Sequence, residues 1–399
     1  MIRNHETVDV FVGLDVGKGE HHAVALDRTG KKLLDRALPN DEGAIRAILT
    51  ELEDHGQVLV VVDQPATIGA LPVAVAQAAG TLIGYLPGLA MRRIADLHPG
   101  EAKTDARDAL IIADAARTMP HALRSIQLAE EQIAELSMLC GFDDDLAKQA
   151  TATSNRIRGL LTQIHPALER VIGPRLDHPA VLDLLRTWPT PEALRHAGRR
   201  RIANRLTRLA PRMGERLADD IVQALGKQTV IVVGTKAATV VLPQLAGMLA
   251  RLHEGRATVY AQVEALVEAH PLHPVLTSMP AVGVRTAARL LTEVVGKDFP
   301  SAGHLASYAG LAPVTWRSGS SIRGDHASRK GNKVLKRALY LSAFAALKDP
   351  LSRAYYDRKR TEGKRHTQAL IALARRRCDT LHAMLRDGTL YQARTPSAA

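Results

Sequence analysis

The chain has 399 residues, long enough for two or three domains that each bury a core, and its hydrophobic fraction of 46% is ordinary for a soluble globular protein. The formal net charge of +12 favours polyanionic partners such as nucleic acid, although an arginine-rich composition alone can also raise the pI. Aromatic residues make up only 3%, which argues against a single-strand binder built on stacked aromatic side chains.

The two cysteines and the first residues bear on the compartment. Cys140 and Cys378 lie far apart without CxxC spacing, which argues against a disulfide framework or a zinc ribbon and fits a reducing cytoplasm. The start, MIRNHETVDV, lacks the apolar run of a signal peptide, and no stretch is long and apolar enough to span a bilayer. We therefore expect a soluble intracellular protein without a membrane partner.

The first 120 residues alternate between strand and helix patterns. Three strands joined by short turns, one of them Arg28-Thr29-Gly30, predict an antiparallel meander, and the unbroken apolar run VLVVVD predicts a strand buried on both faces. The order βββαβαβα matches the ribonuclease-H-like architecture that RuvC-type nucleases share, so we predict an α/β domain over 1–122. The predicted strands are 8–17, 21–27, 31–39, 58–63 and 81–87, and the predicted helices are 41–54, 68–79 and a segment from about Thr104.

The next part, 123–270, has apolar residues at helical spacing and few strand signals. We predict a helical region in which one long helix pair forms a coiled-coil arm. The segment 198–216, GRRRIANRLTRLAPRMGER, is strongly basic. It is equally compatible with a solvated helix face and with a nucleic-acid contact.

The last part, 271–399, is predicted to be mostly helical. The segment 277–294 has the turn pattern of a helix-hairpin-helix, in which Gly283 lies in a tight turn and the backbone amides that follow bind a DNA phosphate. The usual pattern has glycine where this chain has Ala281, so a plain pair of helices is an alternative. We predict a Gly/Ser-rich loop after it, leading into a long amphipathic helix.

Four aspartates are candidate metal ligands. Asp15 ends the first predicted strand, Asp63 ends the buried strand, and Asp105 and Asp108 are three residues apart on one helix face. Alone, each is more often a turn former, a helix cap or a solvent-exposed residue. Together they would meet at the carboxyl ends of the strands, where only a cation could neutralise them. Such oxygen ligands suit Mg2+ or Mn2+ and phosphodiester chemistry.

A second candidate site is the segment from Arg317 to Gly324. It places Ser318, Ser320 and Ser321 between Arg317 and Arg323. A serine can attack phosphorus if its proton is removed, and arginines can stabilise the developing charge. The alternative to a serine nucleophile is a flexible Gly/Ser loop that binds phosphate without taking part in the reaction. A basic tract beyond it is predicted to bind the phosphates flanking a break: Arg329, Lys330, Lys333, Lys336 and Arg337.

Three separated motifs resemble one family. GLDVGK near the start, KTDARDA in the middle and YAGLAP…SGSSIRG…KGNKVLKRALY near the end resemble the DEDD-type transposases of insertion sequences that also use a serine, the bridge-RNA-guided recombinases. The resemblance covers about 1–120 and 275–390, and the stretch 165–260 is longer than short members need. It implies a RuvC-like domain, a coiled-coil region for dimerisation and a C-terminal transposase domain. By the resemblance, Ser318 is the nucleophile, and the Mg2+-binding tetrad is Asp15, Asp63, Asp105 and Asp108.

The resemblance has further implications. They are a covalent phosphoserine–DNA intermediate, strand exchange between donor and target DNA, and a guide RNA from the element that pairs with both. An active site shared by two protomers of a dimer, or of a tetramer of two dimers, is implied as well, in a prokaryotic cytoplasm at the nucleoid. One position departs from the family: Asp63 stands where Glu is common, one methylene shorter but of the same ligand type.

Other function classes stay open at this point. A RuvC-like junction nuclease would use the same carboxylates and only grip phosphate with the serine loop. A non-catalytic helix-hairpin-helix protein would bind DNA without cleaving it. A sugar-kinase or actin-like ATPase is suggested by GLDVGKGEHHAVALD, but a second phosphate loop is not evident.

Overall fold

In the computed structural model the chain forms two compact units, Met1–Leu128 and Ala129–Ala399, which are described separately. The structure describes residues 5–65, 67–98, 104–125, 131–295, 297, 299–318, 322–326, 328 and 330–393.

The first unit is built on one mixed sheet with the strand order β3-β2-β1-β4-β5-β6. The first three strands form the predicted antiparallel meander, while β4 runs parallel to β1 and β5 parallel to β4. The strands are β1 (Val10–Asp15), β2 (Glu20–Asp27), β3 (Lys32–Pro39), β4 (Val58–Val62), β5 (Leu82–Tyr85) and the two-residue antiparallel edge β6 (Arg124–Ser125).

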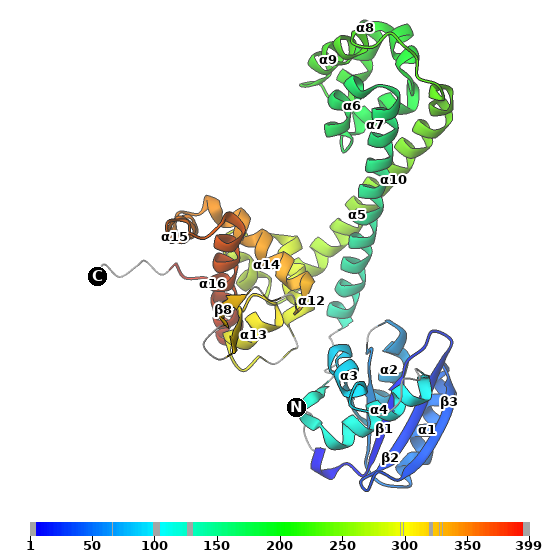
Figure 1. Ribbon diagram of the computed structural model, residues 1–399, viewed down its shortest axis with the longest axis vertical. Helices are drawn as coiled ribbons and strands as arrows, with labels where there is room; N and C mark the ends of the chain where they lie inside the picture. The colour runs from blue at the N-terminus through cyan, green and yellow to red at the C-terminus, as the bar shows by residue number, and fades with distance from the viewer. Residues whose placement is uncertain are drawn as a thin grey trace, which may run out of the picture. The chain divides into compact units, whose positions relative to one another are not determined.

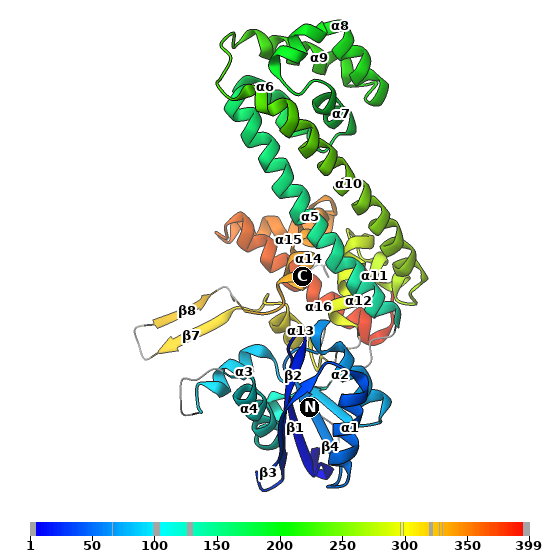
Figure 2. The ribbon, with the colours of Figure 1, turned by 90° about the vertical axis from the view of Figure 1, so that its right-hand side faces the viewer.

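Helices cover both faces of this sheet (Figure 2). On one face, alternate residues of β1 and β4 such as Val12 and Val60 pack against α1 (Glu42–Glu53) and α2 (Ala70–Ala78). On the other face, Phe11 and Val61 pack against α3 (Gly88–Ala95) and α4 (Asp105–Thr118). The buried strand 58–63 and the helix starting after Thr104 were predicted; α3 was not.

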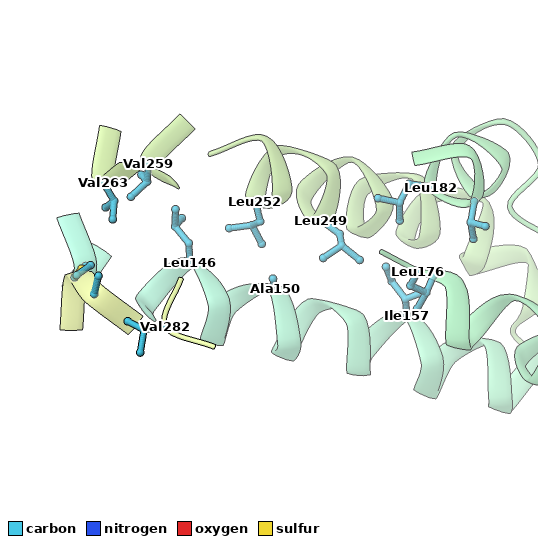
Figure 3. Close-up of a cluster of buried hydrophobic side chains, with 14 of the residues drawn as sticks. Leu146, Ala150, Ile157, Leu176, Leu182, Leu249, Leu252, Val259, Val263 and Val282 are labelled. Atoms are coloured by element: carbon cyan, nitrogen blue, oxygen red, sulfur yellow. The ribbon is translucent and has the colours of Figure 1, made fainter. Parts of the chain in front are cut away.

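The second unit contains the predicted long helix pair, α5 (Glu131–Ile164) and α10 (Ala238–Ala269) (Figure 1). Figure 3 shows Leu146, Ala150 and Ile157 of α5 along the same apolar seam as Val259, Leu252 and Leu249 of α10, so the two helices run antiparallel. The role of the pair in dimerisation stays a prediction. The chain between α5 and α10 forms a bundle of four helices. These are α6 (Pro166–Ile172), α7 (Pro179–Thr187), α8 (Pro191–Leu209) and α9 (Gly214–Gly226).

The rest of the second unit is mostly helical, as predicted, and shares one hydrophobic core with α5 and α10. Its elements are α11 (His273–Ser278), α12 (Val284–Val294), α13 (Ala302–Tyr308), β7 (Val314–Ser318), β8 (Ile322–His326), α14 (Lys333–Ala345), α15 (Pro350–Thr361) and α16 (His366–Asp387). Short 3-10 turns are His5–Thr7, Thr67–Gly69, Pro120–Ala122, Gly173–Arg175, Thr235–Ala237 and Ala346–Lys348.

The segment predicted as a Gly/Ser-rich loop is different in the structure. It is a β-hairpin in which β7 and β8 pair antiparallel, Val314 opposite His326 and Ser318 opposite Ile322. The prediction of a loop was wrong on either side of residues 319–321 because Gly and Ser obscured the β-forming residues beside them. None of the described helices has the length and apolarity needed to cross a membrane.

Candidate active site

Two of the four aspartates lie at the carboxyl ends of adjacent parallel strands, Asp15 as the last residue of β1 and Asp63 directly after β4. Leu14 of β1 pairs with Val62 of β4, so Asp15 and Asp63 come directly after this pair. Side chains alternate along a strand, and Leu14 and Val62 both belong to the core on the α1 side. Asp15 and Asp63 therefore lie on the opposite, α4 side, at neighbouring strands whose backbones are about 4.8 Å apart.

The carboxyl group of Asp63 is half-buried and incompletely hydrogen-bonded. Its Oδ1 is inaccessible to solvent and accepts no hydrogen bond from the described residues. Burial raises the pKa of Asp63 above its ordinary value, although hydrogen bonds from the Gln64 side chain and the Val16 backbone favour the charged form. A buried carboxylate oxygen without a partner is costly, and a bound cation would remove that cost.

The other two aspartates are brought to the same edge of the sheet by α4. A Cβ on Gly13 would lie 2.1 Å from the carbonyl oxygen of Ala109, so α4 lies directly on β1. Near the start of β1, the Nε2 of His5 lies 2.7 Å from the carbonyl oxygen of Ala116. The helix α4 therefore runs antiparallel to β1, and its first turn lies near the carboxyl end of β1.

That first turn contains Asp105 and Asp108 and begins at a side-chain cap. The hydroxyl of Thr104 accepts a hydrogen bond from the Arg107 backbone at 3.3 Å, which fixes where the helix starts. The structure therefore places all four predicted acids at one edge of the sheet, on its α4 side. Among the residues that the structure describes, no group of three or more His, Cys, Asp or Glu side chains is arranged to hold a metal ion. Carboxylate oxygens are the ligand type that a divalent cation prefers, and the unpartnered Oδ1 of Asp63 is the observation at this edge that a bound cation would explain.

The backbone of the predicted serine segment lies on the hairpin. Ser318 is the last residue of β7, and Arg317 pairs with Arg323 across the two strands. The side chains of Ser318, Arg317 and Arg323 are not among those that the structure describes, and Ser320, Ser321 and Arg329 lie outside the described residues.

The segment after the hairpin is held by a cluster that the sequence did not single out. The side-chain amide of Asn332 donates hydrogen bonds to Glu293 Oε2 at 2.5 Å and to the hydroxyl of Tyr308 at 3.0 Å. The backbone N–H of Asn332 donates to the carbonyl oxygen of Tyr308 at 2.7 Å, and its Oδ1 caps α14 at Leu335. Asn332 thus ties the start of α14 to the end of α13, the two helices that flank the hairpin in sequence.

Two residues of the predicted basic tract line a cavity of about 780 Å3 between α5, α10, α12 and α14. Lys333 and Arg337 are exposed there, together with Arg285 from the first turn of α12. The guanidinium of Arg285 lies 4.9 Å from the ring centre of Tyr260. Asp143 and Asp144 also line the cavity, but they pair with Arg256 and Arg289, so Lys333, Arg337 and Arg285 leave the cavity with an excess of positive charge. The N-termini of α12 and α14 add to it.

The remaining predicted phosphate-binding residues lie elsewhere. Lys336 donates its Nζ to the carbonyl oxygen of Ser328 at 3.1 Å and is not part of the cavity wall. Lys330 is exposed beside the same loop. Gly283 is the residue directly before α12 and has an extended backbone. Arg285 was missed, although its place two residues after Gly283 in a helix's first turn is a recognisable anion-binding signal.

Comparison with known proteins identifies the family. A model of IS110-type DEDD transposases, described as "Transposase", matches residues 12–166, and one described as "Transposase IS116/IS110/IS902 family" matches residues 273–357. The chain is 62% identical to the 43.6 kDa protein of insertion element IS110 from Streptomyces coelicolor, over 98% of each chain. It is 38% identical to the 42 kDa protein of IS900 from Mycobacterium paratuberculosis, over 98% of this chain and 99% of that protein. It is 35% identical to the 44.8 kDa protein of IS116 from Streptomyces clavuligerus, over 97% of each.

The first matched segment contains all four aspartates, and the second contains the hairpin, the Asn332 cluster and Arg285, Lys333 and Arg337 of the cavity. Both ends of the chain thus match transposase models at the places where the structure gathers acids and cations. The chain belongs to the IS116/IS110/IS902 family of insertion-element transposases, of the DEDD type, and is a DNA recombination enzyme.

Proposed function

We propose that this transposase cuts and rejoins DNA through a serine phosphodiester, with Asp15, Asp63, Asp105 and Asp108 holding Mg2+. The observation that supports it best is the unpartnered, buried Oδ1 of Asp63, next to Asp15 on the side of the sheet that faces α4. The strand order 3-2-1-4-5, a meander followed by two parallel strands, supports a ribonuclease-H-like domain of the RuvC type over 1–122.

In this proposal the four carboxylates bind the cation, and the bound cation would polarise a phosphodiester oxygen. Asp15 and Asp63 reach it from the strand ends, and Asp105 and Asp108 from the first turn of α4. The sheet positions the first pair rigidly, because β1 and β4 are central strands hydrogen-bonded on both sides.

The proposed nucleophile is Ser318. Its Oγ forms a bond to phosphorus, the bond from phosphorus to a sugar oxygen breaks, and the serine proton ends on the departing oxygen. The reverse step with a hydroxyl of another strand rejoins DNA without an external energy source, since one phosphodiester replaces another. The hairpin position of Ser318, between helices tied together by Asn332, supports a defined placement.

The cavity with Lys333, Arg337 and Arg285 is the proposed phosphate-binding surface of the C-terminal part, 271–399. We further propose that the α5–α10 pair, within 123–270, serves a homodimer that pairs the tetrad of one protomer with the serine of another. The guidance by an RNA of the element rests on the resemblance and on the net positive charge alone.

The nucleophile is tested by trapping protein–DNA adducts in a denaturing gel with element-end DNA. Wild type should form an adduct, and Ser318→Ala should form none while still binding DNA. Ser320→Ala and Ser321→Ala are the matched controls and should keep the adduct. Strand exchange retained by Ser318→Ala would contradict the assignment, and cleavage without any adduct in wild type would point to a hydrolytic junction nuclease instead.

The cation is tested on the full chain without DNA, by thermal unfolding with and without Mg2+ or Mn2+. The melting temperature of wild type should rise on adding the ion, because only the folded protein presents the four carboxylates together. Asp63→Asn and Asp105→Asn should lose this rise, and Glu53→Gln, an exposed acid on α1, should keep it. An equal rise in all four proteins would remove the tetrad from the mechanism.

A further inference from the structure

The bundle α6–α9 lies between the two segments that the family models match, at the opposite end of the α5–α10 pair from α11–α16 (Figure 1). It contains a one-sided run of positive charge. Residues 193–214 include seven arginines and no aspartate or glutamate. This excess needs an explanation, because a solvated helix face ordinarily mixes both signs of charge.

Some of these arginines hold the bundle together. Arg199 binds Asp219 at 2.6 Å and Glu215 at 3.0 Å, which joins α8 to α9. Arg205 binds Asp183 of α7 at 2.7 Å. Arg195 donates to the carbonyl oxygen of Leu225 at 3.1 Å. These three have structural partners inside the bundle and account for the acids of α7 and α9 that face α8.

The other four, together with Arg216, form what we name the arginine face: Arg200, Arg201, Arg208, Arg212 and Arg216. All five are exposed, and within the described residues none of them forms an ion pair with an acid. Arg201 and Arg208 are seven residues apart, so they lie two turns and about 10.5 Å apart on one side of α8. Arg212 is in the turn after α8, and Arg216 is in the first turn of α9.

The turn that connects these residues is rigid. A Cβ on Gly214 would lie 2.5 Å from the backbone nitrogen of Thr207, so α8 and α9 cross in direct backbone contact. Leu206 and Ile202 of α8 are fully buried in the same core as Leu217 and Ile221 of α9. The arginine face is therefore presented by a fixed scaffold, and little conformational entropy of the backbone is lost when it binds.

The geometry points to double-stranded DNA as the partner, bound through its phosphates. Duplex DNA carries one negative charge per about 1.7 Å of axis, so the exposed arginines of α8, which span about 12 Å from Arg200 to Arg208, meet phosphates at any sequence. Residues 193–216 contain no Phe, Trp or Tyr, so the face lacks the stacking surface that single strands require. We propose that the arginine face is a second DNA-binding surface, which contacts the duplex away from the breakage site.

This inference goes beyond the serine and metal chemistry and needs neither. Arg289 of α12 donates a hydrogen bond to the carbonyl oxygen of Cys140 on α5, and α5 ends at Ile164 before the bundle, so about 36 Å of helix separates α12 from the bundle. A DNA contact at that distance would anchor the duplex through its backbone, without reading sequence. The inference gives the bundle, which neither family model covers in full, a task of its own.

The test compares two triple variants of the full chain. Arg201→Gln/Arg208→Gln/Arg212→Gln removes three charges of the arginine face. Lys227→Gln/Lys236→Gln/Arg251→Gln removes three exposed charges of the same half of the unit, outside the face. Binding of a fluorescent random-sequence DNA duplex is measured by anisotropy over a salt series, and thermal unfolding is followed for both variants.

The face variant should bind DNA at least about tenfold more weakly, and its salt dependence should be shallower by about 3 in the log–log slope. The control should stay close to wild type in both, and both should unfold at the wild-type temperature. Equal losses in the two variants would overturn the proposal, since they would reflect net charge alone. A loss confined to a hairpin RNA probe, with duplex DNA unaffected, would overturn it in favour of RNA.

A second variant separates binding from folding. Arg199→Gln breaks the ion pairs with Asp219 and Glu215, so it should lower the unfolding temperature and leave the salt slope unchanged. A reduced slope in Arg199→Gln would contradict the division of the arginines into two groups. Because adduct formation by Ser318 is scored separately on element-end DNA, failure of the serine assignment and failure of this inference are distinguishable.

Discussion

The guanidinium of Arg377 donates a hydrogen bond to the carbonyl oxygen of Pro280 at 2.6 Å, which joins α16 to the turn between α11 and α12. It also donates to Ser342 Oγ at 2.7 Å, and this hydroxyl donates to the carbonyl oxygen of Ala281 at 3.2 Å. Arg377 is only 5% exposed, and burial lowers its pKa to about 10. Two consecutive carbonyl groups of the turn are thus held by one buried network.

The turn held in this way contains Ala281 with φ +61°, the left-handed conformation that glycine adopts most easily. This is the position where the helix-hairpin-helix pattern has glycine, so the backbone has the shape of that pattern without its residue. We predict that Ala281→Gly raises the free energy of unfolding by about 0.5–1 kcal/mol, since strain of about 1–2 kcal/mol is relieved and exceeds the entropy cost of ordering glycine, which is less than about 1 kcal/mol. Urea unfolding measures it. Ala281→Val should destabilise, and a stabilised Val variant would show that the turn is not strained.

The close approach of α4 to β1 yields a second prediction. Gly13→Ala places a Cβ 2.1 Å from the carbonyl oxygen of Ala109 and 2.4 Å from the nitrogen of Ala113, so α4 must move away from the sheet. Asp105 and Asp108 then move away from Asp15. We expect a loss of stability of roughly 2 kcal/mol or more, as for other overpacked core positions, and loss of the melting-temperature rise with Mg2+.

The matched control is Gly88→Ala, because a Cβ on Gly88, at the start of α3, meets no atom within 4 Å. This variant should keep both stability and the response to the cation. Wild-type behaviour of Gly13→Ala would contradict the direct contact between α4 and β1.

Much of the first unit could be predicted because its signals are local. VLVVVD predicts a buried strand, and the alternation of side chains along β1 and β4 decides which face Asp15 and Asp63 share. The helix start at Thr104 follows from an N-cap residue before an amphipathic pattern. The helix α3 was missed because its eight residues are too few for a clear period.

The contacts of the second unit could not be predicted in the same way. Asn332 binds Glu293 and Tyr308, 39 and 24 residues earlier in the chain, and sequence spacing contains no signal for such pairs. Arg285 and Lys333 line one cavity only because α12 and α14 pack together. The arginines that hold the bundle together and those of the arginine face look alike in sequence. Only the fold decides which of them lie near an acid, as Arg199 and Arg205 do.

A third prediction concerns Asn332. Asn332→Ala removes the hydrogen bonds to Glu293 and Tyr308 and the cap of α14, so stability should fall by about 1–3 kcal/mol. If the start of α14 also positions the hairpin, adduct formation on element-end DNA should fall more than DNA binding. Asn332→Ser should retain the cap and recover part of the stability without recovering adduct formation. Full adduct formation by Asn332→Ala would limit this residue to a role in stability.

The fourth prediction concerns the alkaline pH dependence of stability. Cys378 is fully buried, and burial raises the pKa of its thiol from 9.0 to about 11. Between these values the unfolded chain loses the thiol proton while the folded chain keeps it. The folded state therefore binds more protons, and the free energy of unfolding falls as pH rises, by about 1.4 kcal/mol per pH unit well above the unfolded pKa.

We expect the unfolding free energy of wild type to decrease more steeply with pH than that of Cys378→Ala, by about 1 kcal/mol between about pH 9 and pH 10. The comparison uses the slope, since removal of the buried sulfur also lowers stability at every pH. Arg377, whose pKa is about 10 in the folded state, contributes with the opposite sign, because the unfolded chain keeps a proton that the folded chain loses. Both proteins contain Arg377, so its contribution cancels in the comparison. Parallel pH profiles of the two proteins would show that the Cys378 thiol ionises in the folded state as readily as in the unfolded chain.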